Sequence, residues 1–250
     1  MSGLRGRTVV VTRAGHQAGA LADLLTARGA TVLPIPTIAI APPVEWEAVD
    51  AALAALDGYD WIVFTSANAV AAVWERLGHL GVVLPAGLRT AAVGPPTAAA
   101  LAARGAAVPV LPATFQGDLL AGVMPDLAGA RVLLPRGDLA RDATVEALEA
   151  AGALVERLTV YRTIPVEVAP ADRALLREGV DAITFTAPST VRNFAAAMGG
   201  EVSAVLGGTL VACIGPVTAE AVRELALPEP LQAPEATSAS LVAALEAHFS

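Results

Sequence analysis

The chain has 250 residues, of which 55% are hydrophobic and 4% aromatic, and its 16 basic and 24 acidic side chains give a formal net charge of −8. This length allows one large domain or two small ones, and a charged fraction of only 16% excludes a disordered chain. Every basic residue is arginine, which excludes chemistry that depends on a lysine amine, such as a Schiff base or a Walker phosphate loop.

Charge and cysteine content also restrict the partners and the compartment. The acidic balance and the lack of clustered arginines argue against nucleic acid. Cys213 is the only cysteine, so no internal disulfide can form and a reducing compartment is expected. Apolar runs are too short, or too interrupted by glycine and proline, for a signal peptide or a membrane span. We therefore expect a cytoplasmic protein with no membrane partner.

Short β-branched runs alternate with alanine- and leucine-rich stretches of helical period, which predicts an α/β protein with parallel sheets. A first strand is expected at 8–11 and a helix at 17–28 that stops at Gly29. Further strands, each followed by a short polar loop and a helix, are predicted at 61–64, 91–93, 131–134, 182–185 and 210–214. Two extended stretches that contain proline, 33–43 and 159–170, are expected to cross between two lobes.

An internal repeat is the most informative feature of the sequence. Residues 8–40 align without a gap with 131–163, so that Arg13 meets Arg136 and Gly29 meets Gly152. Further matches follow in the same order, namely 60–65 with 181–186, 93–98 with 214–219, and 113–114 with 236–237. Any two α/β halves share strands and helices, but they do not share loop residues in this way. The repeat therefore predicts two similar lobes with a ligand cleft between them.

Two matched segments place glycine at a turn and proline in the first turn of a helix. One contains Gly94 and Thr97, and the other contains Gly215, Val217 and Thr218. Such helix starts present backbone N–H groups and a positive dipole end, which suit a carboxylate or a phosphate. Ordinary helix capping is the alternative interpretation.

A second matched pair of loops, 65–68 and 186–189, could also bind a carboxylate or a phosphate. It contributes Ser66, Asn68 and Ser189 as candidate binding residues. Both loops directly follow predicted strands, and ligands in open α/β sheets bind beyond the carboxyl ends of strands.

Thr12 with Arg13, and Arg136, follow matched strands, and each arginine could hold a carboxylate with two hydrogen bonds. Solvated loop charges are the alternative. Tyr161 lies on a predicted crossing strand. It either fills the core or directs its phenol into the cleft as a proton donor.

Common cofactor signatures are absent from the sequence. No G-x-G-x-x-G segment follows a strand, and there is no G-x-S-x-G segment. His16, His79 and His248 lack metal-ligand spacing. The residues alone thus predict a two-lobed α/β protein without metal or organic cofactor, whose cleft suits an anionic small molecule.

The same loops carry a resemblance to a known family. VTR at 11–13, DWIVFTSANAV at 60–70, AVGP at 92–95, PRGD at 135–138, LTVYRT at 158–163, FTAPSTV at 185–191 and IGPVTA at 214–219 resemble the successive motifs of uroporphyrinogen-III synthases. The ordered set spans nearly the whole chain. The resemblance implies two flavodoxin-like domains, 1–36 with 167–250 and 40–163, joined by a two-stranded connector at 37–39 and 164–166.

The resemblance also implies a reaction. Members of this family cyclise the linear tetrapyrrole hydroxymethylbilane, a polycarboxylate, to uroporphyrinogen III, with inversion of the last pyrrole ring, loss of water and no cofactor. Tyr161 corresponds to the family's proposed proton donor to the departing hydroxyl, and Thr218, Ser189, Ser66 and Thr97 correspond to residues that line the cleft. Ala187 stands where many relatives have serine. A monomer is expected.

Two alternatives remain open from the sequence. One is a catalytically silent tetrapyrrole-binding or regulatory module of the same fold. The other is an unrelated two-lobed transferase that acts on a phosphorylated substrate.

Overall fold

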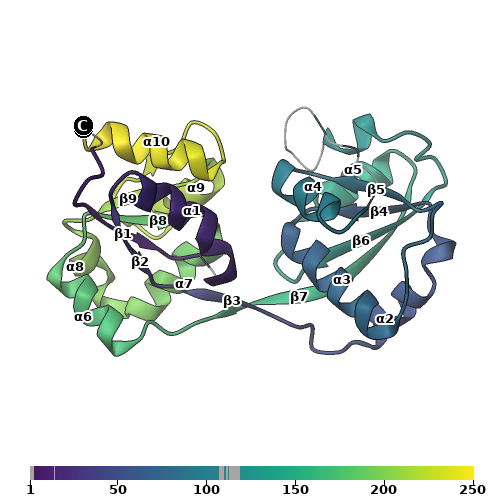
Figure 1. Ribbon diagram of the computed structural model, residues 1–250, viewed down its shortest axis with the longest axis horizontal. Helices are drawn as coiled ribbons and strands as arrows, with labels where there is room; N and C mark the ends of the chain where they lie inside the picture. Colours follow the sequence, from purple (N-terminus) through teal and green to yellow (C-terminus); the bar gives the residue numbers. More distant parts are fainter. Residues whose placement is uncertain (1–2, 14, 107–109, 111, 113–118) are drawn as a thin grey trace. The chain divides into compact units, whose positions relative to one another are not determined.

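The structure is a computed structural model that describes residues 3–13, 15–106, 110, 112 and 119–250. The chain forms two compact units, the first made of residues 1–39 and 164–250 and the second of residues 40–163 (Figure 1). It passes from the first unit to the second within strand β3 (Ile38–Ala41) and returns within strand β7 (Leu154–Pro165). β3 and β7 are neighbours in one sheet.

The sheet of the first unit has the order β10-β9-β8-β1-β2, and all its pairs are parallel. Counted along this unit's own chain, the order is 2-1-3-4-5, the flavodoxin-like arrangement. The strands are β1 (Thr8–Val11), β2 (Thr31–Pro34), β8 (Ala182–Phe185), β9 (Leu210–Cys213) and β10 (Leu231–Gln232).

Helices cover both faces of this sheet, as the apolar composition of its strands requires. Val9 and Val11 face α1 (Gly15–Ala27) and α10 (Ser238–His248), while Val10 faces the opposite layer. That layer contains α6 (Pro170–Glu178), α7 (Pro188–Met198), α8 (Val202–Leu206) and α9 (Pro216–Glu224) (Figure 1). A short 3₁₀ turn, Gly199–Glu201, joins α7 to α8.

The sheet of the second unit has the order β3-β7-β6-β4-β5, with β4 (Trp61–Phe64), β5 (Arg89–Ala92) and β6 (Arg131–Gly137). The pairs β7-β6, β6-β4 and β4-β5 are parallel. One face is covered by α2 (Glu47–Ala54), α3 (Ala67–Leu80) and α4 (Pro95–Ala102). The other is covered by α5 (Ala143–Ala150) and a 3₁₀ turn at Ala121–Val123, and a further 3₁₀ turn, Leu56–Gly58, precedes β4.

The segments matched in sequence occupy equivalent places in the two sheets. β1 and β6 are interior strands, β8 and β4 pair with them on one side, and β9 and β5 come next. The carboxylate of Asp181 accepts a 2.8 Å hydrogen bond from the backbone N–H of Thr8, and that of Asp60 accepts one of 2.8 Å from the N–H of Arg131. These shared contacts are what a duplicated unit predicts.

The α/β class with parallel sheets, the first helix and the six strands predicted from the sequence are confirmed. Residues 113–114, which the repeat matched with 236–237, lie outside the described residues. The first unit takes in residues 37–39 and 164–166, which the sequence assigned to a connector. Thr37 is buried there and its hydroxyl donates to the carbonyl of Thr190 at 3.2 Å, which ties this crossing to α7.

Within the part of the chain that the structure describes, every helix is too short or too polar to cross a membrane.

Candidate functional site

In each unit, the candidate residues follow strands that end at the same edge of a parallel sheet. In the first unit, Thr12 and Arg13 follow β1, and Ser189 lies just beyond β8, the neighbour of β1. In the second unit, Arg136 is the next-to-last residue of β6, and Ser66 follows the adjacent β4. In doubly wound sheets, ligands bind beyond the carboxyl ends of the strands, at the point where the strand order reverses.

The structure brings Tyr161 and Ser66 together in the second unit. The phenol oxygen of Tyr161 lies 3.2 Å from Oγ of Ser66, within hydrogen-bond distance, and both side chains are half-buried. Ser66 is the N-cap of α3, and its Oγ accepts a 3.2 Å hydrogen bond from the N–H of Ala69. The two hydroxyl groups thus form a hydrogen-bonded pair at the end of the sheet, in which either oxygen can be the donor.

The equivalent loop of the first unit lacks the capping hydroxyl. Ala187 is the N-cap of α7 with the same extended backbone as Ser66, but no side chain caps this helix. The carbonyl of Ala187 instead accepts hydrogen bonds from the N–H of Thr190, at 3.1 Å, and from its hydroxyl, at 2.7 Å. The two units therefore differ in chemistry at matched positions.

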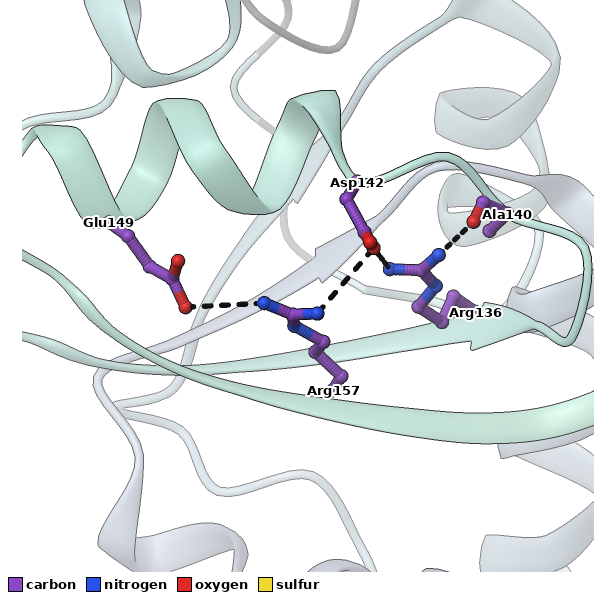
Figure 2. Close-up of polar contacts among 5 residues, drawn as sticks. All are labelled: Arg136, Ala140, Asp142, Glu149 and Arg157. Carbon is purple, nitrogen blue, oxygen red and sulfur yellow. Dashed lines mark hydrogen bonds and ion pairs between the residues drawn. The ribbon is translucent and has the colours of Figure 1, made fainter.

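Arg136 is buried, and its guanidinium is engaged within its own loop. One NH group donates to Asp142 at 2.6 Å and the other donates to the carbonyl of Ala140 (Figure 2). Arg157 lies 3.7 Å from Asp142 and 3.7 Å from Glu149. The hydrogen bond from Arg136, together with its charge and that of Arg157, lowers the pKa of Asp142. Arg136 thus holds the loop that follows β6, and these contacts must open before it can chelate a ligand carboxylate.

Thr12 has its hydroxyl engaged as well. It is fully buried and donates to the carbonyl of Thr184 at 2.8 Å, while the hydroxyl of Thr184 donates to the carbonyl of Val10 at 2.9 Å. This exchange joins β1 to β8. Arg13, the next residue, is partly buried, and burial lowers the pKa of its guanidinium.

The two matched helix starts also differ. At α4, Pro95 and Pro96 have no N–H group, and the N–H of Thr97 donates to the carbonyl of Gly94 at 3.0 Å. The expectation of several available N–H donors at Gly94 is therefore wrong, because two prolines occupy the first turn. At α9, which begins after Gly215, the residue at the second position is Val217, so its N–H remains in place beside that of Thr218.

The remaining candidates have simpler surroundings. Thr97 and Thr218 are almost fully buried, and Asn68 is half-buried in the first turn of α3. Cys213 is buried on β9, and burial raises the pKa of its thiol to about 12, as for a structural cysteine. Among the described residues, no three His, Cys, Asp or Glu side chains gather as a metal site.

Sequence reasoning missed Gly137 and Asp138, which lie beside Tyr161. A Cβ atom added at Gly137 would lie 2.5 Å from Cζ of Tyr161, and the N–H of Asp138 donates to the carbonyl of Tyr161 at 3.2 Å. The glycine of the PRGD segment at 135–138 was the available signal, since glycine within a strand often marks a bulge or a close approach.

Comparisons with known proteins agree over most of the chain. The family model described as "Uroporphyrinogen-III synthase HemD" matches residues 19–243. The uroporphyrinogen-III synthase of Synechococcus elongatus is 36% identical over 254 residues, which cover 97% of this chain and 96% of that protein. The uroporphyrinogen-III synthase of Chlorobaculum parvum is 31% identical and covers 88% of this chain and 90% of that protein.

Solved structures share the fold. A uroporphyrinogen III synthase from the extremely thermophilic bacterium Thermus thermophilus gives a TM-score of 0.65 at 24% identity and covers 97% of both chains. The uroporphyrinogen-III synthetase of Helicobacter pylori gives 0.64 at 19% identity, covering 96% of this chain and 98% of that one.

The unequal caps lead to a prediction about stability. Ala187→Ser should stabilise the protein by about 0.5–1 kcal/mol, because a serine side chain can accept from the first turn of α7. Ser66→Ala should destabilise it by about 1 kcal/mol, because α3 loses its cap. Urea unfolding followed by circular dichroism measures both changes. If Ala187→Ser lowers the midpoint, the two loops are not equivalent.

Proposed function

This chain belongs to the uroporphyrinogen-III synthase family, whose members act in porphyrin biosynthesis, and we propose that it cyclises hydroxymethylbilane to uroporphyrinogen III. The reaction inverts the last pyrrole ring and releases water, so the enzyme is a lyase. The 36% identity to the Synechococcus elongatus synthase over 97% of the chain carries this proposal. Matched loops at the carboxyl ends of both sheets support it.

We propose that Tyr161 protonates the departing hydroxyl. Its phenol lies 3.2 Å from Ser66, and the O–H of Ser66 can donate to the phenol oxygen while Oγ still accepts from Ala69. In that arrangement the phenol proton points to the substrate, and Ser66 stabilises the phenolate that remains after transfer. The bilane also closes spontaneously without inversion, so the other requirement is to hold the correct carbon in range.

We propose that backbone N–H groups hold many of the substrate's carboxylates. The starts of α9, at Val217 and Thr218, and of α7, at Ser189, retain donors in the first turn. Arg13 would add a charge-assisted bond. Asn68, Thr97 and Gly215 complete the proposed set of substrate-binding residues. Thr12 and Arg136 act on the shape of their loops rather than on the substrate directly.

We further propose that the enzyme needs no cofactor and acts on its small-molecule substrate as a cytoplasmic monomer. An acid and a set of anion-binding donors suffice for cyclisation with loss of water, and one chain supplies both. The single cysteine and the acidic charge support this setting.

The reaction itself is tested by its product. Protein stripped of metals and nucleotides, given freshly generated hydroxymethylbilane, should yield the type III isomer on chromatography. Only the type I isomer, formed at the spontaneous rate, would contradict the proposed activity.

The role of Tyr161 is tested by removing one oxygen atom. Tyr161→Phe keeps the ring but deletes the proton donor, and general acid catalysis contributes about 10²- to 10⁴-fold. We expect a fall in kcat near the lower end, since water can replace the phenol. Tyr59→Phe is the matched control. The Tyr59 hydroxyl donates to Glu156 at 2.6 Å, and Tyr59 precedes β4, so it lies at the amino-terminal ends of the strands, away from the candidate site. Parental kcat in Tyr161→Phe would exclude the proton donor.

The helix start of α9 is tested by copying the start of α4. Val217→Pro reproduces the Gly-Pro-Pro-Thr segment that α4 already tolerates, and it removes a single N–H. Loss of a charge-assisted hydrogen bond of ~1.5–3 kcal/mol should lower kcat/KM roughly 10- to 150-fold. Val217→Ala keeps the N–H and is the control. Equal kinetics in the two variants would reject the role of this donor.

A further inference from the structure

Tyr161 and Ser66 come from strands that are not neighbours. The order of the sheet is β7-β6-β4, so the phenol on β7 must cross the end of β6 to reach the residue after β4. Neighbouring strands lie about 4.8 Å apart, so the side chain and its 3.2 Å contact with Ser66 together bridge about two strand spacings. The residue of β6 beneath this path is Gly137, and a Cβ there would lie 2.5 Å from Cζ, 2.6 Å from Cε2 and 2.8 Å from the phenol oxygen of Tyr161.

A change of register places Tyr161 opposite this glycine. Arg136 pairs with Thr159, but Gly137 pairs with Tyr161, so β7 has one extra residue, Val160, at this point. Consecutive side chains of a regular strand point to opposite faces, yet Val160 and Tyr161 both contact the core cluster beneath α2, α3 and α4. The irregularity thus turns Tyr161 toward β6 and β4, as β-bulges near active sites do.

The loop after Gly137 is fastened on both sides. Arg136 donates to Asp142 and to the carbonyl of Ala140, which closes the loop over the end of β6. Asp138 bonds β7 twice, since its N–H donates to the carbonyl of Tyr161 and its Oδ1 accepts from the N–H of Thr163 at 2.9 Å. The gap at position 137 is therefore fixed relative to the backbone of Tyr161.

We propose that Gly137 and Arg136 are positioning residues that direct the Tyr161 phenol onto Ser66. Gly137 provides the space in which the ring lies, and Arg136 holds Gly137 in register with Tyr161. The inference rests on the proposed role of Tyr161 as a proton donor. In this proposal the buried guanidinium of Arg136 acts through its bonds to Asp142 and Ala140, and it does not need to contact a ligand.

Gly137→Ala is expected to move the phenol of Tyr161 while the protein still folds. Gly137 has no positive φ, so alanine fits its backbone, and only the far end of a side chain obstructs the new methyl group. Gly137→Ala should displace the ring while the melting temperature stays within a few degrees, because a compatible alanine also reduces the entropy of the unfolded chain. Gly78→Ala, with no atom near its added Cβ, is the matched control.

A spectroscopic test follows from the presence of only two tyrosines. In a Tyr59→Phe background labelled with 3-fluorotyrosine, Tyr161 gives the single ¹⁹F resonance. Gly137→Ala and Arg136→Lys should each shift this resonance, as Ser66→Ala should, whereas Gly78→Ala should not. An unchanged resonance in Gly137→Ala overturns the proposal. An unchanged resonance in Arg136→Lys overturns the part assigned to Arg136.

Kinetics distinguish positioning from general damage. Gly137→Ala should lower kcat about 10-fold and leave KM within about twofold, since part of the general-acid contribution is lost. Added to Tyr161→Phe, the same change should lower kcat by less than about twofold, because no phenol proton remains to be misplaced. Equal losses in the two backgrounds would contradict the proposal. The ¹⁹F result does not depend on turnover, so it remains decisive if Tyr161→Phe proves fully active and the proposed acid role fails.

Discussion

Parallel pairing fixes where chemistry can occur in both units. Because β7, β6, β4 and β5 run in one direction, their ends and the starts of the helices that follow lie at one edge of the sheet. The same holds for β2, β1, β8, β9 and β10 in the first unit. Side chains far apart in sequence, such as Ser66 and Tyr161, thereby become neighbours. Each candidate residue owes its place to this constraint.

At the carboxyl ends of these strands, the lack of a side chain at Gly137 matters as much as the side chains that are present. The phenol of Tyr161 reaches Ser66 because residue 137 is glycine and because one extra residue on β7 sets the two positions opposite each other. In the first unit, the matched loop has Ala187 in place of Ser66. The two similarly arranged units thus differ: one has a hydrogen-bonded pair of hydroxyl groups, while the other has mainly helix starts and a partly buried arginine.

The sequence predicted the fold well because its signals are local. Three consecutive valines, Val9 to Val11, suit a strand buried on both faces, and Gly29 and Gly152 both adopt positive φ values after matched helices. The same local signals also predicted that the candidate residues lie at the carboxyl ends of the strands. The repeat was visible for the same reason, since shared loop residues perform shared backbone tasks.

The contacts of individual side chains were less predictable. From the sequence, Arg136 could either hold a ligand carboxylate or be a solvated loop charge. It does neither in the structure, because it bonds Asp142 and the carbonyl of Ala140, and these contacts depend on how the loop folds back. The two prolines at α4 were visible in the sequence, and their missing N–H groups should have separated this helix from α9. The register shift at Gly137 depends on the pairing of β6 with β7, so no local sequence pattern predicts it.

These observations bear on how an acidic protein binds a polyanion. At least nine arginines are engaged in ion pairs with carboxylates of the same chain, namely Arg7, Arg28, Arg76, Arg89, Arg136, Arg157, Arg177, Arg192 and Arg223. Their charges are largely balanced before a substrate arrives. Backbone N–H groups at helix starts carry no counter-charge and are already oriented, so they bind carboxylates without first breaking an ion pair. A net charge of −8 is therefore compatible with a carboxylate-rich substrate, provided that binding relies on backbone dipoles more than on an arginine cluster.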